Sequence, residues 1–210
     1  MSENKAGLRG MLKLGLILAL YATVACVGLA FVYAGTAKVI AQHQEEDLET
    51  ALKDLFPAAD SFKPITGIKS SDPAVTIEEG GAFGALKNGR AIGLVLRTSR
   101  ASYSGAIKIL VGVAVDGKIS GVRILEHSDT PGLGANAGSA NYYVDRAKGI
   151  RFYDQFAGKK VSDPFVPKQD VTAITAATIT SRAVAESVKA AGEAASAWLA
   201  SAANTLGGSR

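Results

Sequence analysis

The longest apolar stretch of the chain is near its N-terminus, over residues 14–37, and reads LGLILALYATVACVGLAFVYAGTA without a charged side chain. An α-helix needs ~20 apolar residues to cross the hydrocarbon core of a membrane. The stretch therefore predicts a single transmembrane helix. A cleaved signal peptide is the alternative interpretation, although the apolar region of a signal peptide is usually only ~7–15 residues long.

The charges on the two sides of this apolar stretch differ in sign. Basic residues precede it and acidic residues follow it: Lys5, Arg9 and Lys13 before, and Glu45, Glu46, Asp47 and Glu49 after. Positive charge near a membrane helix marks its cytoplasmic side. We therefore expect residues 1–13 to form a cytoplasmic N-terminus and the main domain to lie outside the cytoplasm.

Beyond the membrane, the apolar pattern changes from a helical to a strand period. Residues 38–56 have leucines at helical spacing and stop before Pro57, which predicts an amphipathic stalk helix. Residues 57–90 are rich in proline and glycine and predict short strands and turns. Residues 91–98 predict a strand, and residues 107–127 alternate as a β-hairpin that turns at Asp116-Gly117.

The last third of the chain predicts a loop followed by helices. Residues 128–143 contain Pro131 and three glycines, which favours a loop over a strand or a helix. Residues 152–159 are typical of a short helix, and the alanine-rich residues 181–203 predict the last helix. The fold class is α+β: an antiparallel sheet with flanking helices in one domain, residues 57–203, behind the membrane helix, with a C-terminal tail at 204–210.

Composition narrows the classes of function. The net charge of +4 comes from 23 basic and 19 acidic residues that are scattered along the chain, so no nucleic-acid partner is expected. One cysteine and two histidines exclude an intrachain disulfide framework and argue against a bound metal. The chain also has neither a GxGxxG nucleotide motif nor an iron–sulfur cysteine pattern.

The segment DVTAITAATITSRAV, residues 170–184, concentrates hydroxyl side chains just before the last helix: Thr172, Thr175, Thr178, Thr180 and Ser181. An ordinary N-cap accounts for Thr180 or Ser181. It does not account for Thr175 and Thr178, which this prediction places too far before the helix. A helix N-terminus is also a phosphate-binding site, and Arg182 in the first turn can add a charge-assisted hydrogen bond.

Two motifs, TAAT at residues 175–178 and DTPGLGANA at residues 129–137, resemble the extracytoplasmic FMN-binding domain family. More closely, the chain is similar to the G subunits of the Rnf/Rsx membrane electron-transport complexes, relatives of the C subunit of the sodium-pumping NADH:quinone oxidoreductase. The anchor, YSGAIKILVGV at 103–113 and FYDQFAGK at 152–159 extend the resemblance over nearly the whole chain.

The resemblance implies covalent FMN, held by a phosphoester on the last threonine of the motif. That residue is Thr178. The implied surroundings of the cofactor are its neighbours and the TPGLG loop, residues 130–134: Thr175, Ala177, Thr180, Ser181 and Arg182, with Thr130, Gly132, Leu133 and Gly134. A structural turn is the competing explanation for this loop, above all for Pro131.

The motif departs from the family at two positions. Ala176 replaces the usual glycine, and Thr172 replaces an acid commonly found six residues before the modified threonine. Alanine can replace this glycine only if the backbone there does not need a positive φ. Asp170 is the nearest acid that could stand in for the missing one.

The resemblance implies a membrane-anchored flavoprotein that relays electrons within a multisubunit ferredoxin:NAD oxidoreductase complex coupled to ion translocation. Its partners would be the other Rnf/Rsx subunits, a flavin transferase and membrane lipid. Two alternatives are an anchored ligand- or partner-binding domain without redox activity and a lone extracytoplasmic flavin reductase. A hydrolase built on Glu126, His127, Ser128 and Asp129 is disfavoured, because adjacent residues cannot form a catalytic triad.

Overall fold

The computed structural model describes residues 3–207, so the predictions for residues 1–2 and 208–210 lie outside the described chain. It divides into two compact units, Met1–Asp47 and Leu48–Arg210. Helix α1, Glu3–Leu55, begins in the first unit and ends in the second. The predicted membrane helix and stalk helix are thus one continuous helix.

The first unit consists of the apolar part of α1. Among the described residues, α1 is the one helix long and apolar enough to cross a membrane. Its large apolar side chains, such as Leu18 and Phe31, are exposed, and Cys26 is exposed beside them. Because no part of the described chain covers these side chains, the helix fits a single-pass membrane anchor.

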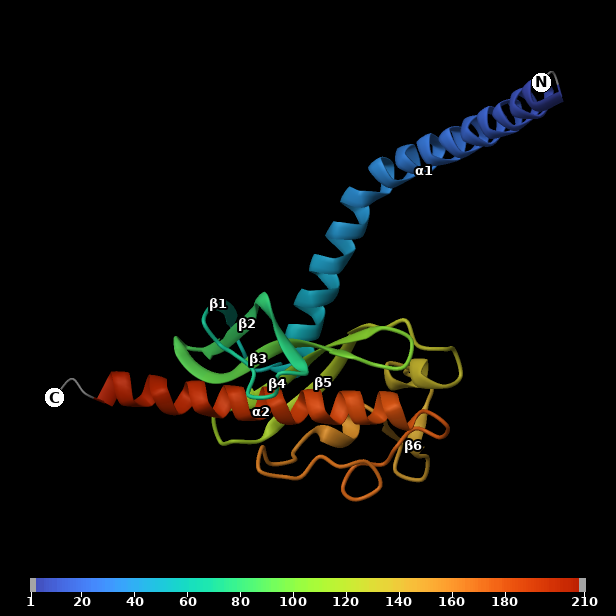
Figure 1. Cartoon of the computed structure of the whole chain (residues 1–210). Coiled ribbons are helices and arrows are strands. Elements are labelled where there is room, and N and C mark those ends of the chain that lie inside the picture. The colour runs from blue at the N-terminus through green and yellow to red at the C-terminus, as the bar shows by residue number, and fades with distance from the viewer. Residues whose placement is uncertain (1–2, 208–210) are drawn as a thin grey trace. The chain divides into compact units, whose positions relative to one another are not determined.

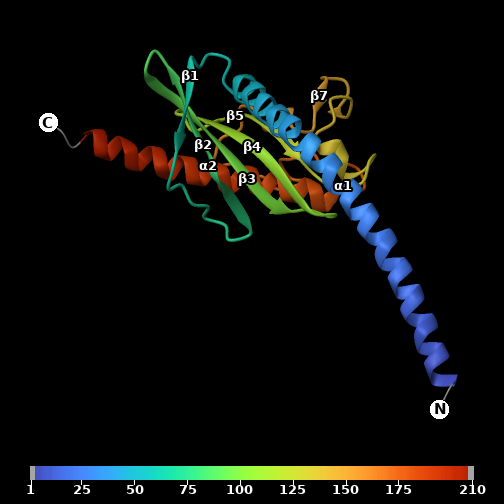
Figure 2. The same ribbon diagram turned by 90° about the horizontal axis from the view of Figure 1, so that it is seen from above.

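The second unit is built on a five-stranded antiparallel sheet in the order β1-β2-β3-β4-β5 (Figures 1 and 2). The strands are β1 Ser61–Ile65, β2 Val75–Lys87, β3 Arg90–Ala101, β4 Ala106–Ala114 and β5 Ile119–Glu126. The predicted hairpin is confirmed: β4 pairs with β5, and Gly117 in their turn has a φ of 77°. The predicted strand at 91–98 lies within β3.

Helix α2, Thr178–Gly207, runs across one face of this sheet, as Figure 2 shows. Alternate residues of β3 point to opposite faces, so Leu94 and Leu96 join the core beneath α2 while Val95 joins a second core on the other face. Alanines and valines of α2 face the sheet and are buried: Ala183, Val184, Ala185, Val188, Ala191, Ala194 and Ala195. Small side chains let the helix pack closely on the strands.

The other face of the sheet receives the end of α1. Leu55 and Phe56 are buried there, over a floor made by glycines of three neighbouring strands. A Cβ added at Gly93 would meet the ring of Phe56 and lie 2.7 Å from the carbonyl oxygen of Val113, and one at Gly121 would lie 3.0 Å from Leu55. The residues predicted as the end of a stalk are therefore part of the domain core.

Short elements connect the sheet to α2. They are the 3-10 helix η1 Gly134–Ala137, the two-stranded sheet of β6 Tyr143–Asp145 and β7 Ile150–Arg151, and the 3-10 helix η2 Asp154–Phe156. The region 128–143, predicted as a loop, thus contains one 3-10 turn. The helix expected at 152–159 is a single 3-10 turn, followed by Gly158 with a φ of 80°.

Candidate functional site

The N-terminus of α2 starts earlier than the sequence pattern suggests. Thr178 is the first helical residue, and the N–H of Ser181 donates to the carbonyl of Ala177 at 3.0 Å. The Ser181 hydroxyl accepts a hydrogen bond from the N–H of Ile174 at 2.8 Å and donates to the carbonyl of Ala177 at 2.9 Å. The N-cap interpretation of Thr180 and Ser181 is therefore wrong, as is the placement of Thr178 before the helix.

A tight turn over residues 174–177 brings the chain into α2. The N–H of Ala177 donates to the carbonyl of Ile174 at 3.1 Å, and Ala176 has a φ of 58°. The N–H of Thr175 donates to the hydroxyl of Tyr142 at 3.2 Å, which ties the turn to a distant segment. Residue 176, where the family has glycine, thus adopts the left-handed conformation. Alanine in this conformation costs about 1 kcal/mol of stability.

The first turn of α2 leaves backbone N–H groups without an intrahelical acceptor. Within the described chain, the N–H groups of Thr178, Ile179 and Thr180 have no hydrogen-bond acceptor. The Thr178 side chain is exposed beside them. Free N–H groups and the partial positive charge of a helix N-terminus together form a binding site for an anion such as phosphate.

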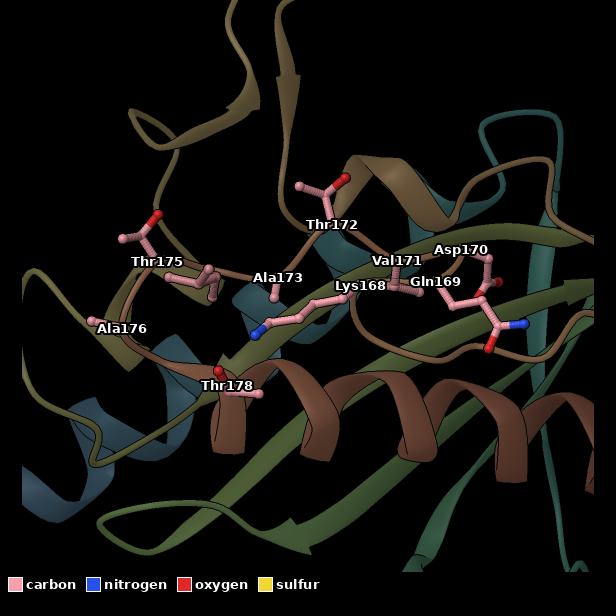
Figure 3. Close-up of a pocket in the computed structure, with 10 residues that line it drawn as sticks. Lys168, Gln169, Asp170, Val171, Thr172, Ala173, Thr175, Ala176 and Thr178 are labelled. Atoms are coloured by element: carbon pink, nitrogen blue, oxygen red, sulfur yellow. The ribbon is translucent and has the colours of Figure 1, made fainter.

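One cavity beside Thr178, called the polar cavity below, is lined mainly by polar and charged residues. It has a volume of about 580 Å³ and is lined by Lys168–Ala176 and Thr178. Figure 3 shows the Lys168 side chain extending from its loop toward the Thr178 end of α2. Thr172 and Thr175 also line this polar cavity, so the structure brings together the hydroxyls that the sequence singled out.

The loop that carries Lys168 is organised by Asp170. The Asp170 carboxylate accepts hydrogen bonds from the N–H groups of Val166 at 2.6 Å and Phe165 at 3.2 Å, and from the Lys159 ammonium at 3.2 Å. Burial raises the pKa of Asp170, but these bonds and the Lys159 charge outweigh it and hold the pKa below its usual value. Both Asp170 oxygens are thus used to shape the loop.

A second cavity next to the same turn, called the apolar cavity below, is more apolar. It has a volume of about 480 Å³, and both cavities share Ala176 and Thr178. Three exposed apolar side chains surround it: Tyr103 (71% exposed), Leu133 (41%) and Ile179 (56%). Its volume lies in the range of small-molecule sites. Thr178 therefore marks the boundary between a polar and an apolar cavity.

The TPGLG loop forms one wall of this apolar cavity. Thr130, Leu133 and Gly134 line it, whereas Gly132 does not. The N–H of Leu133 donates to the carbonyl of Thr130 at 3.1 Å, with Pro131 and Gly132 (φ 79°) between them, which is typical of a type II turn. The turn interpretation is confirmed for Pro131 and also explains Gly132.

Asp129 connects this loop to α2 and to the β3–β4 turn. One carboxylate oxygen accepts hydrogen bonds from the hydroxyls of Ser102 at 2.6 Å and Thr180 at 2.7 Å, and the other accepts from the N–H of Ser104 at 2.9 Å. Burial raises the pKa of Asp129, but these three donors and nearby His127 hold the pKa below its usual value. The carboxylate is therefore charged at neutral pH.

The structure does not bring every predicted residue to the cavities. Arg182 is exposed but lines neither of them, and Ser181 is buried behind the turn. Sequence reasoning missed Tyr103 and Lys168 and considered Asp129 only for hydrolysis. The glycines and prolines that flank these residues indicate turns, but the sequence pattern does not show that the turns converge.

Comparison with known proteins agrees with this architecture. The FMN-binding domain family matches residues 102–193, which include both cavities, and the RnfG N-terminal region matches residues 1–55. These matches define the class: a membrane-anchor helix followed by an FMN-binding domain.

Three relatives cover most of the chain. The G subunit of the proton-translocating ferredoxin:NAD(+) oxidoreductase complex of Clostridium ljungdahlii is 34% identical, over 79% of this chain and 80% of its own. Its Na(+)-translocating counterpart in Acetobacterium woodii is 30% identical, over 84% and 87%. The G subunit of the ion-translocating oxidoreductase complex of Aliivibrio fischeri is 33% identical, over 85% and 87%. The chain belongs to this family, the G subunits of the Rnf-type ion-translocating oxidoreductase complexes.

Among solved structures, NqrC of Shewanella oneidensis is similar to this chain with a TM-score of 0.46 and 17% identity, over 70% of this chain and 73% of that one.

Proposed function

We propose that the protein is a membrane-anchored flavoprotein that carries FMN covalently on Thr178 and relays electrons within an ion-translocating ferredoxin:NAD oxidoreductase complex. The observation that carries the proposal is the position of Thr178. Its exposed side chain lies at the N-terminus of a helix, on the boundary between a polar and an apolar cavity. FMN joins a phosphate to an aromatic isoalloxazine ring through a ribityl chain, so an attachment point between these two environments suits both ends of the cofactor.

The residues present fit FMN. The free N–H groups at the start of α2 and the Lys168 ammonium complement the phosphate. Tyr103, Leu133 and Ile179 offer apolar surface to the isoalloxazine ring, with Thr130 at the same cavity. Gly134 lets the loop backbone approach Thr180 and Asp129 closely at this cavity.

When bound, the flavin supplies the redox chemistry, and the protein binds and orients it. The covalent link prevents loss of the cofactor from a domain that we place outside the cytoplasm. The turn over residues 174–177 exposes Thr178 to a flavin transferase, while Thr180 and Ser181 are buried and bonded within the domain. Of the three hydroxyls in this first turn, that of Thr178 is thus the accessible one.

The positive residues before the apolar segment support a cytoplasmic N-terminus, with the FMN-binding domain on the opposite side of the membrane. The relatives named above are subunits of multisubunit complexes, so we propose that this chain works with the other Rnf/Rsx subunits and with membrane lipid around α1. Their names differ in the ion moved, and the proposal specifies none.

The experiment is intact-mass analysis of the full chain, produced together with a flavin transferase, followed by peptide mapping. We expect an increment equal to FMN less one water on the peptide that contains Thr178. Thr178→Ala should abolish the increment while the domain stays folded. Thr175→Ala is the matched control, because its N–H bond to Tyr142 survives the change, and it should only weaken attachment.

Flavin retained on Thr178→Ala would overturn the assignment of the attachment residue. A wild-type chain without any increment would overturn covalent attachment itself. In that case the alternative, an anchored ligand- or partner-binding domain without redox activity, becomes the leading hypothesis.

A further inference from the structure

Asp129 is a buried acid in the wall of the apolar cavity. Asp129 is 5% exposed. Among the described residues that line this cavity, it has the single charged side chain. Its three hydrogen-bond donors, from Ser102, Ser104 and Thr180, are all neutral. Within the described chain Asp129 forms no ion pair, and His127, the one nearby basic group that lowers its pKa, makes no contact with its carboxylate.

The N-terminus of α2 opposes this charge only in part. Thr180, which bonds to Asp129, is in the first turn of α2, where the helix dipole amounts to roughly half a positive charge. A carboxylate carries a full negative charge at the same place. The net field at this end of the cavity is therefore negative, and it is stronger in a low-dielectric wall than in water.

From this geometry we infer that Asp129 lowers the reduction potential of the flavin in the apolar cavity. This inference rests on the proposed function. Two-electron reduction adds two electrons from the donor and one or two protons to the ring. With one proton, the reduced ring gains a negative charge beside the Asp129 carboxylate. Coulomb repulsion then disfavours the reduced form relative to the oxidised form.

The hydrogen bonds to Asp129 serve to keep it ionised. Without donors, a buried carboxyl would take up a proton and lose its field. Here two hydroxyls and one backbone N–H stabilise the charged form, with a pKa below the usual value. Asp129 therefore acts on the flavin through its charge, and the reduction potential of the flavin measures this effect.

The test is a redox titration of the full flavin-loaded chain in detergent, with dithionite as the electron donor and the flavin absorbance as the readout. Asp129→Asn keeps the shape and removes the charge. We expect its midpoint potential to rise by about 30 mV or more, which is a tenfold change in the equilibrium constant of the two-electron couple. Asp116→Asn, an exposed acid at the opposite end of β4, is the matched control and should leave the potential unchanged.

Ser102→Ala separates charge from structure, because it removes one hydrogen bond and keeps the carboxylate. The N–H of Ser104 and the Thr180 hydroxyl still donate to Asp129 in Ser102→Ala and keep it charged, so the electrostatic explanation predicts no rise in potential. A loosened cavity would instead shift both variants in the same direction. An unchanged potential in loaded Asp129→Asn, or a rise in Ser102→Ala, overturns the inference and leaves the proposed function standing. If Asp129→Asn does not fold, a rise in the potential of Ser102→Ala still overturns the inference. Wild-type protein without flavin would overturn the proposed function and the inference together.

Discussion

The hydroxyl of Thr180 donates a 2.7 Å hydrogen bond to the carboxylate of Asp129, a residue 51 positions earlier in the chain. This bond joins the first turn of α2 to the TPGLG loop. Ser102 donates to the same carboxylate oxygen, so three separate segments meet at one buried atom. The wall of the apolar cavity depends on this junction, and so does the position of Thr178 two residues before Thr180.

The junction leaves no room for a side chain at Gly134. A Cβ there would lie 2.5 Å from the Thr180 hydroxyl oxygen and 2.6 Å from an Asp129 oxygen. Gly134→Ala is therefore expected to destabilise the domain by about 1–3 kcal/mol and to reduce flavin loading. Urea unfolding measures the first effect. Gly138→Ala is the control, because its Cβ would meet only Ile124, at 3.3 Å, and it should lose less stability. Equal losses of stability in the two variants would show that the contacts with Asp129 and Thr180 are not the cause.

Ala176 holds a backbone conformation that favours glycine. Its φ of 58° predicts that Ala176→Gly raises the free energy of unfolding by about 1 kcal/mol. Ala173→Gly lies in the same segment without a positive φ and should lower stability by about 0.5–1 kcal/mol. Thermal unfolding of both variants checks the prediction. A loss of stability in Ala176→Gly would show that the turn is not strained.

Lys168 points its charge along the polar cavity toward Thr178 (Figure 3). Lys168→Met removes an interaction of about 1 kcal/mol with a phosphate, so flavin attachment should slow about fivefold. The time course of the mass increment measures this rate. Lys168→Arg should retain most of the attachment rate. Lys189 is an exposed lysine of α2 outside both cavities, so Lys189→Met should retain the full rate. An unchanged rate in Lys168→Met would exclude a phosphate contact.

Asp170 links the stability of the domain to pH. Its pKa is lowered in the folded protein, so its contribution to stability is present above the ordinary aspartate pKa of about 3.9 and is lost as the pH falls below it. Asp170→Asn should destabilise the domain at pH 7 and flatten the fall in stability between about pH 5 and pH 2. Urea unfolding across this range checks the slope. If the stability of the variant falls with pH as steeply as that of the wild type, groups other than Asp170 cause the acid sensitivity.

Local patterns were sufficient for the N-terminal apolar helix and for the β4–β5 hairpin, because the causes of these elements are local. The uncharged run at 14–37 predicted an apolar helix, and the alternation around Asp116-Gly117 predicted the β4–β5 hairpin. The helix-capping rules gave a wrong prediction for the start of α2. Capping rules assume that Thr180 and Ser181 serve their own helix, whereas Thr180 bonds to Asp129 and Ser181 to the N–H of Ile174.

By itself, the sequence determined an apolar anchor, an α+β domain and, through its resemblance to a family, Thr178 as the residue to examine. Only the tertiary structure decided that Asp129 is a buried charge of the cavity wall, that Lys168 reaches the polar cavity, and that Arg182 reaches neither. The physical reason is that hydrogen bonds such as that between Asp129 and Thr180 join residues far apart in the chain. A periodic pattern records which face of an element is buried, but not which distant side chain it meets.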